Sequence, residues 1–146
     1  MNNPFSSEDF DMQDIRGDQY AVFPPVRNWL RFEGLGYLAL AVCVYQALGY
    51  SWMQFALWVL LPELTIATYF FGNARACSYF YNAAHSSVLP ALLGVLGVLL
   101  ADSIALQASL IWFANVGLNR VMGCGLRFPL GFRVTHLGLL RNWRRE

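Results

Sequence analysis

A long central stretch of this sequence is almost free of charge. Between Gly34 and Asn119, only Glu63, Arg75 and Asp102 carry a formal charge. Soluble globular proteins carry about 25% charged residues, whereas this chain of 146 residues carries 13% and is 57% hydrophobic. The sequence therefore predicts an integral membrane protein of one domain, and it excludes a nucleic-acid-binding protein and a secreted disulfide scaffold.

Four hydrophobic passages make up the central part of the chain. Each has close to the roughly 20 residues that a helix needs to cross a hydrocarbon core of about 30 Å. The expected passages are Phe32–Leu48, Trp52–Phe71, Tyr79–Leu100 with a bend at Pro90, and Ile104–Met122 with Asp102 as its N-cap. Lipid offers the backbone no hydrogen-bond partners, so such passages fold as helices. The predicted fold class is all-α, an integral membrane four-helix bundle.

The two ends of the chain differ from its centre in charge. Residues 1–28 are expected to form an acidic arm, with Pro24-Pro25 punctuating the chain before the membrane, residues 29–124 the transmembrane domain, and residues 125–146 an Arg-rich amphipathic tail. A tail that mixes Arg with Leu, Phe and Trp suits the interface between lipid and water. Arginines flank the first and last passages, and Arg75 lies between the second and third. The positive-inside rule then places both termini and the Arg75 loop in the cytoplasm.

Cysteine usage gives no sign of disulfides or of a metal cluster. Cys43, Cys77 and Cys124 are odd in number, widely spaced and without a CxxC pattern. We expect them to be small, buried apolar residues.

Polar residues inside the passages are the informative ones, because a charge near the bilayer centre costs about 3 kcal/mol on insertion scales. Counting residues from the expected helix ends puts Glu63, His85 and Asn115 at similar depth. One polar cluster in the cytoplasmic half of the bundle would satisfy such groups together. The expected cluster consists of Glu63, Asn82, His85, Asn115 and Asn119.

Each of these residues has a structural and a functional interpretation. Glu63 either fixes helix register or serves a functional site. His85 is either a packed neutral side chain or a metal ligand, haem ligand or proton carrier. The two asparagines of the last passage are expected to form interhelical hydrogen bonds. Outside the cluster, His136 is expected at the surface, and the interfacial anchors are expected to be Arg120, Arg127, Arg133 and Trp143.

Several short motifs occur in an order that resembles a known family. They are Pro62-Glu63-Leu64, Tyr81-Asn82-Ala83-Ala84-His85-Ser86, the run from Trp112 to Arg120, Gly123-Cys124-Gly125-Leu126-Arg127 and Thr135-His136-Leu137-Gly138. The resemblance covers about residues 29–140. It is to an uncharacterised family of small four-helix bacterial integral membrane proteins, known only as a domain of unknown function, and it implies a location in the bacterial inner membrane.

The resemblance also implies a set of metal-binding side chains that this chain has partly lost. It implies Asp at the position of Glu63, His at that of Asn115 and Asp at that of Asn119. Histidines and carboxylates together would suit zinc or iron. The two amides keep hydrogen bonding but remove charge and ligand basicity, so we expect no cofactor. Candidate metal ligands that remain are Glu63, His85 and His136.

Three functions stay open from the sequence. The first is a non-catalytic subunit or assembly component of a larger inner-membrane complex, respiratory or photosynthetic, with other membrane subunits and lipids as partners and no nucleic acid. The second is a metal-dependent, membrane-embedded hydrolase-like enzyme using Glu63, His85 and His136. The third is a carrier of protons or small solutes, although four short helices without an inverted repeat make a poor transporter. Nucleotide-binding and nucleophile-elbow motifs give no support to other chemistry.

Overall fold

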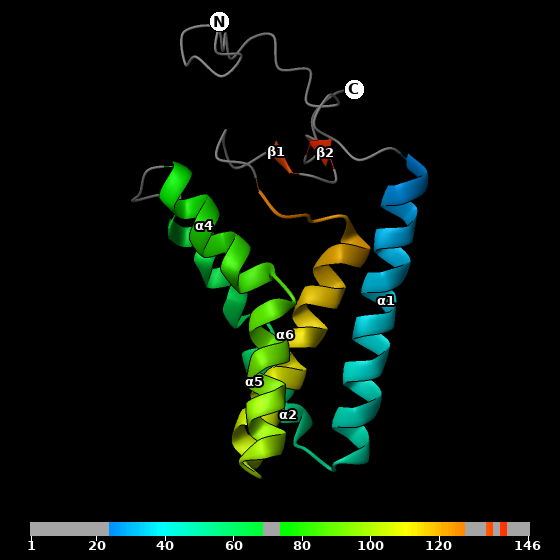
Figure 1. The fold of residues 1–146 in the computed structure, drawn as a ribbon, viewed down its shortest axis with the longest axis vertical. Coiled ribbons are helices and arrows are strands. Elements are labelled where there is room, and N and C mark those ends of the chain that lie inside the picture. The colour runs from blue at the N-terminus through cyan, green and yellow to red at the C-terminus, as the bar shows by residue number, and fades with distance from the viewer. Residues whose placement is uncertain (1–23, 69–73, 128–133, 136–137, 140–146) are drawn as a thin grey trace, which may run out of the picture.

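The computed structural model describes residues 24–68, 74–127, 134–135 and 138–139. The regular secondary structure of this part of the chain is helical apart from two strands of two residues each. The elements are α1 (Pro24–Ala47), α2 (Trp52–Trp58), the 3-10 helix η2 (Leu61–Ala67), α4 (Ala74–His85), α5 (Val88–Leu99), α6 (Ser103–Met122), β1 (Val134–Thr135) and β2 (Gly138–Leu139) (Figure 1). The all-α fold class is thus confirmed for the described residues.

Helix α6 is the centre of the fold. It runs antiparallel to α1 on one side and forms a hairpin with α5 on the other (Figure 1). Its buried residues are Ser109, Ile111, Ala114, Asn115, Val116, Gly117 and Asn119. Several of these are polar, so α6 brings hydrogen-bonding groups as well as apolar surface into the interior.

Glycines allow α6 to approach both of its neighbours closely. A Cβ on Gly117 would lie 2.7 Å from the Gly34 carbonyl oxygen of α1, and a Cβ on Gly97 would lie 2.7 Å from the Leu106 backbone nitrogen. A Cβ on Gly94 would lie 2.6 Å from the Ser109 hydroxyl oxygen. Gly94, Gly97 and Gly117 therefore permit close helix packing.

Both ends of α6 are capped by the residues that their chemistry favours. Asp102 Oδ1 accepts hydrogen bonds from the backbone N–H groups of Ile104 (2.9 Å) and Ala105 (3.2 Å), so its predicted N-cap role is confirmed. At the other end, Gly123 adopts φ 84°, which lets its N–H and that of Cys124 bond back to the last turn of the helix.

Helix α1 begins earlier than the sequence predicted. The expected start was Phe32, or Trp29 at the earliest, but the helix begins at Pro24. Proline is well accepted in a first helical turn, where its missing N–H has no partner to lose, so the Pro24-Pro25 pair opens the helix instead of interrupting the chain before it. At the far end, Tyr45 is fully buried and its hydroxyl donates to the Ser51 carbonyl oxygen at 2.7 Å.

The second and third passages are each broken into two helices, whereas the sequence predicted an unbroken second passage and a bend at Pro90 in the third. The second is split into α2 and η2, and its expected end at Phe71 lies outside the described residues. The third begins at Ala74, not at Tyr79, and breaks at Ser86–Ser87, not at Pro90. A proline removes the hydrogen bond to the carbonyl four residues earlier, so the disturbance appears one turn before the proline itself.

No helix in the described residues is by itself both long and apolar enough to cross a membrane. Arg75–His85 and Val88–Leu99, which bend by 42° at their junction, have the length and composition of one span when taken together. The described helices nevertheless expose many large apolar side chains, among them Leu99 (74% exposed) and Ile104 (76%).

Other predictions have mixed outcomes. The three cysteines are free, but only Cys77 is buried, whereas Cys43 is exposed. The strands β1 and β2 were not predicted; they pair antiparallel, with Val134 opposite Leu139. Figure 1 places them at the end of the molecule where α1 begins and α6 ends. Residues 1–23 of the expected acidic arm and most of the expected tail lie outside the described residues.

Candidate functional site

The break between α2 and η2 leaves a backbone carbonyl without its helical hydrogen-bond donor. A side chain of α6 supplies a donor instead. Pro62 has no N–H to donate to Trp58, and the N–H of Glu63 bonds to the Leu60 carbonyl oxygen at 3.0 Å. The Val59 carbonyl therefore loses its usual helical donor. The side-chain amide of Asn115 replaces that donor, with Nδ2 at 2.8 Å from the Val59 oxygen.

The break between α4 and α5 also leaves a carbonyl without its helical donor. The N–H of Val88 bonds to the Ser86 hydroxyl oxygen at 3.2 Å, so it does not reach the Ala84 carbonyl, its usual helical partner. The indole Nε1 of Trp112 donates to the Ala84 oxygen instead, at 2.6 Å. Trp112 and Asn115 are three residues apart on α6 and so lie on one face of the helix. That face therefore supplies the hydrogen-bond donors at both breaks.

Glu63 is the hub of what we call the polar cluster, which consists of Glu63, His85, Asn115 and Asn119. Its Oε1 lies 2.6 Å from Asn119 Nδ2 and 3.2 Å from Asn115 Nδ2. The same oxygen lies 3.0 Å from His85 Nε2. Three nitrogens thus converge on one carboxylate oxygen, and they join η2, α4 and α6. The His85 side chain is 3% exposed and that of Glu63 is 27% exposed.

The contacts of His85 require a proton to be shared with Glu63. His85 Nδ1 lies 2.9 Å from the Tyr81 carbonyl oxygen, which can only accept, so Nδ1 carries a proton. Nε2 faces Glu63 Oε1, and one further proton must lie between those two atoms for the contact to be attractive. The pair is therefore an imidazolium with a carboxylate, or a neutral imidazole with a carboxylic acid.

Tyr81 and Arg127 extend the cluster by stacking. The rings of Tyr81 and His85 are parallel within 12° at a centroid separation of 3.9 Å, and the Arg127 guanidinium carbon lies 3.9 Å from the Tyr81 centroid. Two planar groups at that distance must occupy opposite faces of the phenol ring. Arg127 is 5% exposed, whereas the sequence predicted an anchor that extends toward lipid headgroups.

Asn82 does not join the polar cluster as predicted. Its amide forms two hydrogen bonds with the backbone of Arg127: Nδ2 donates to the carbonyl oxygen at 2.9 Å, and Oδ1 accepts from the N–H at 2.6 Å. The side-chain amide thus pairs with the backbone of one residue in the way that two β-strands exchange N–H and C=O bonds. This pairing holds the segment after α6 against α4.

Arg120 has a partner that the sequence analysis overlooked. Its Nη1 lies 3.6 Å from Glu33 Oε2 of α1, and its guanidinium lies over the Tyr37 ring at 5.2 Å. The Tyr37 hydroxyl donates to the same Glu33 carboxylate. A carboxylate one helical turn before a tyrosine, at the start of the apolar part of α1, was the signal for this group. Arg133, His136 and Trp143 lie outside the described residues.

Of the three predicted metal ligands, Glu63, His85 and His136, the described residues include only the first two. Glu63 and His85 are in contact, but among the described residues no group of three His, Cys, Asp or Glu side chains could hold an ion. Both ring nitrogens of His85 already face oxygen atoms. An ion at Nε2 would have to replace the contact with Glu63.

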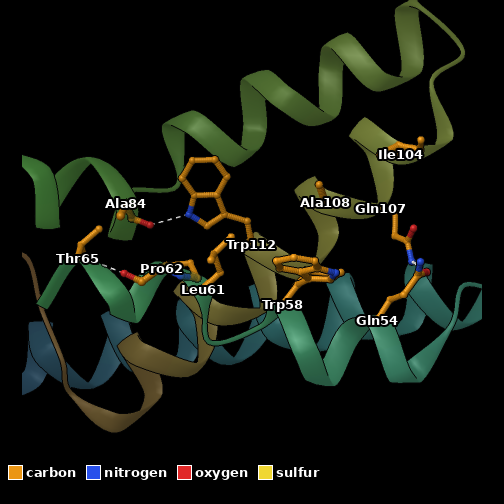
Figure 2. Close-up of a pocket in the computed structure, with 11 residues that line it drawn as sticks. Gln54, Trp58, Leu61, Pro62, Thr65, Ala84, Ile104, Gln107, Ala108 and Trp112 are labelled. Carbon is orange, nitrogen blue, oxygen red and sulfur yellow. Dashed lines mark hydrogen bonds between the residues drawn. The ribbon is translucent and has the colours of Figure 1, made fainter. Parts of the chain in front are cut away.

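An apolar cavity lies beside the polar cluster. Its volume is about 590 Å³, within the range of about 300–1,000 Å³ that is usual for small-molecule sites. Figure 2 shows Trp58 and Trp112 along its length, Gln54 and Gln107 at one end, and Thr65 at the other. The two glutamines were overlooked in the sequence, although an amide in an apolar helix is itself a signal. Gln107 Nε2 lies 2.7 Å from Gln54 Oε1.

Comparisons with known proteins identify a family without assigning an activity. Neither curated proteins nor solved structures give a match to this chain. A family model described as a domain of unknown function, DUF4260, matches residues 27–140. The resemblance noted from the motifs is therefore confirmed, and the chain belongs to the DUF4260 family.

Proposed function

We propose that this chain is a non-catalytic accessory subunit of a larger inner-membrane complex. The observation that carries the proposal is that side chains of α6 form hydrogen bonds to the neighbouring helices. Asn115 and Trp112 bond to carbonyls at the two helix breaks, and Asn119 bonds to Glu63. Side chains that satisfy one another in this way hold helices together, which is the role of a scaffold.

The apolar outer surface supports a location in the membrane. Helix α5 packs on α6 with one side, and its exposed apolar residues include Leu92, Val95, Leu96, Val98 and Leu99. Contiguous apolar surface of this kind is covered by lipid or by a partner protein in the native setting. The bent pair of α4 and α5 is the part of the described chain that has the length and composition of a span.

The distribution of arginine supports an orientation with both termini in the cytoplasm. Helices α1 and α4 begin, and α6 ends, at the same end of the molecule (Figure 1). That end holds Arg31 near the start of α1, Arg75 at the start of α4 and Arg120 in the last turn of α6. Asp102 is the charged residue between α5 and α6 at the opposite end. By the positive-inside rule the arginine end is cytoplasmic.

Photocrosslinking in native membranes tests the subunit proposal. A photoreactive amino acid replaces Leu96 or Leu99 on the exposed side of α5, and in a separate variant it replaces Leu40 on the exposed side of α1. We expect one polypeptide of constant mass to be crosslinked from one of these helices and not from the other. Crosslinks to lipid alone from both helices would overturn the proposal of a fixed partner, and release of the chain by carbonate washing would overturn membrane embedding.

The metal-dependent enzyme remains a second proposal because the structure brings Glu63 and His85 into contact at 3.0 Å and leaves the carboxylate partly exposed. It requires His136 as a third ligand. Elemental analysis of the purified protein tests it: near one equivalent of zinc or iron, lost in the His85→Ala variant while the fold is retained, would favour this proposal. A metal-free protein from native membranes would count against it.

A further inference from the structure

The cavity described above is an elongated groove between three parts of the chain. Its walls come from α2 and η2, from the end of α4 and from α6. Figure 2 shows Ile104 and the two glutamines at one end, and Thr65 with Ala84 at the other. From Ile104 to Trp112 the groove follows α6 over eight residues, which corresponds to about 12 Å at the helical rise.

The chemistry of the lining selects an uncharged ligand. None of the described residues that line the groove carries a formal charge. The walls are formed mainly by apolar and aromatic side chains, including Trp58, Leu61, Ile111 and Trp112. Water would find few hydrogen-bond partners along these walls and is a poor occupant. An ionised group inside the groove would have no counter-charge.

The groove is continuous with the exposed apolar surface. Three of its lining residues, Trp58, Leu61 and Ile104, are themselves 50%, 51% and 76% exposed. A flexible chain can therefore enter sideways from surrounding lipid without crossing a polar rim. The polar end of the groove lies at the first turns of α6, the helix that Asp102 caps. That is the end of α6 which the proposed orientation places at the membrane surface.

We propose that this groove binds one hydrocarbon chain of a membrane phospholipid. The chain lies against Trp58 and Trp112, with its tip toward Thr65 and Ala84. Its ester end lies at the pair formed by Gln54 and Gln107, where the side-chain N–H groups of Gln54 are the donors for a carbonyl oxygen, because Gln107 Nε2 already donates to Gln54 Oε1 and to the Tyr45 hydroxyl. The inference rests on the proposed membrane embedding, and it adds a specific lipid site to it.

A photoactivatable phosphatidylcholine with a diazirine in one acyl chain tests the site. The full-length protein is reconstituted in vesicles of phosphatidylcholine that contain this lipid, irradiated, digested and analysed by mass spectrometry. The test variant is Ala108→Phe, which fills the groove from α6. The matched control is Ala56→Phe on α2, because Ala56 is exposed and does not line the groove.

We expect adducts to concentrate in residues 54–65 and 104–112. They should fall about tenfold in Ala108→Phe, as a loss of about 1.4 kcal/mol in affinity implies, and should persist in Ala56→Phe. Adducts spread evenly over the exposed faces of α1 and α5 and unchanged by Ala108→Phe would overturn the lipid site while leaving membrane embedding in place. A chain that fails to reconstitute and stays free of the vesicles would overturn both.

Discussion

Replacing Asn115 tests whether α6 holds the first helix break. In the Asn115→Ala variant, the Val59 carbonyl loses a donor at 2.8 Å and Glu63 loses one at 3.2 Å. Leaving a buried acceptor unpaired costs about 1–3 kcal/mol, and interhelical hydrogen bonds in membrane proteins average about 0.6 kcal/mol. Because this carbonyl is partly buried, we expect a loss of about 1.5 kcal/mol in the free energy of unfolding, or about tenfold in the folding equilibrium.

A second variant separates the hydrogen bonds from the volume of the side chain. Asn115→Asp keeps nearly the same size but replaces a donor by an acceptor that faces two other oxygens. We expect Asn115→Asp to destabilise the fold at least as much as Asn115→Ala. Equilibrium unfolding in mild detergent, followed by tryptophan fluorescence, measures both.

The reasoning would be refuted by either of two results. A wild-type midpoint for Asn115→Asp would mean that the amide donor is not needed at the break. Equal stability of Asn115→Ala and the wild-type protein would mean that the Val59 carbonyl is satisfied without α6.

Four further substitutions probe other parts of the fold by the same unfolding assay. Trp112→Phe keeps an aromatic ring but removes the donor 2.6 Å from the Ala84 carbonyl, so we expect a loss of about 1–2 kcal/mol; an unchanged midpoint would contradict the second break contact. Gly117→Ala forces a Cβ to 2.7 Å from the backbone of α1 and should cost about 1–3 kcal/mol, whereas Gly36→Ala meets nothing within 4 Å and should stabilise α1 by about 0.5–1 kcal/mol; the same sign for both would argue against close packing. Asp102→Ala removes the cap of α6 and should cost about 1 kcal/mol, and a neutral effect would show that the cap is dispensable.

The grouping of Glu63, His85 and Asn115 is the part of the site that sequence reasoning anticipated. A helix advances by a constant rise per residue, so counting from its ends gives the depth of each side chain. Polar groups at equal depth in an apolar bundle are expected to find one another. The structure brings these three side chains into contact around one carboxylate oxygen.

The helix breaks were harder to anticipate because their cause and their effect lie at different residues. Pro62 and Pro90 were visible in the sequence, but each acts on the carbonyl four residues before it. The carbonyls left without a helical donor at the two breaks are those of Val59 and Ala84, and whether they are satisfied depends on a donor from elsewhere. Here Asn115 and Trp112 supply those donors from α6, and no local pattern around the prolines reveals them.

Asn82 and Arg127 show a second limit of local reasoning. Spacing along α4 placed Asn82 near His85, since three residues bring side chains to one face. The amide instead pairs with the backbone of Arg127, which is 45 residues away in the sequence. The bond depends on the path of the chain after Gly123, where a positive φ turns it back across α4. Sequence spacing within one helix carries no information about such a turn.

The central claim is that this chain is a non-catalytic subunit of a larger membrane complex, and purification from native membranes tests it most directly. The tagged protein is extracted in a gentle detergent and separated on a native gel, and each band is analysed by mass spectrometry and for metals. The account predicts co-migration with one large complex at fixed stoichiometry, without metal assignable to this chain. A free small species that carries near one equivalent of zinc or iron would contradict it.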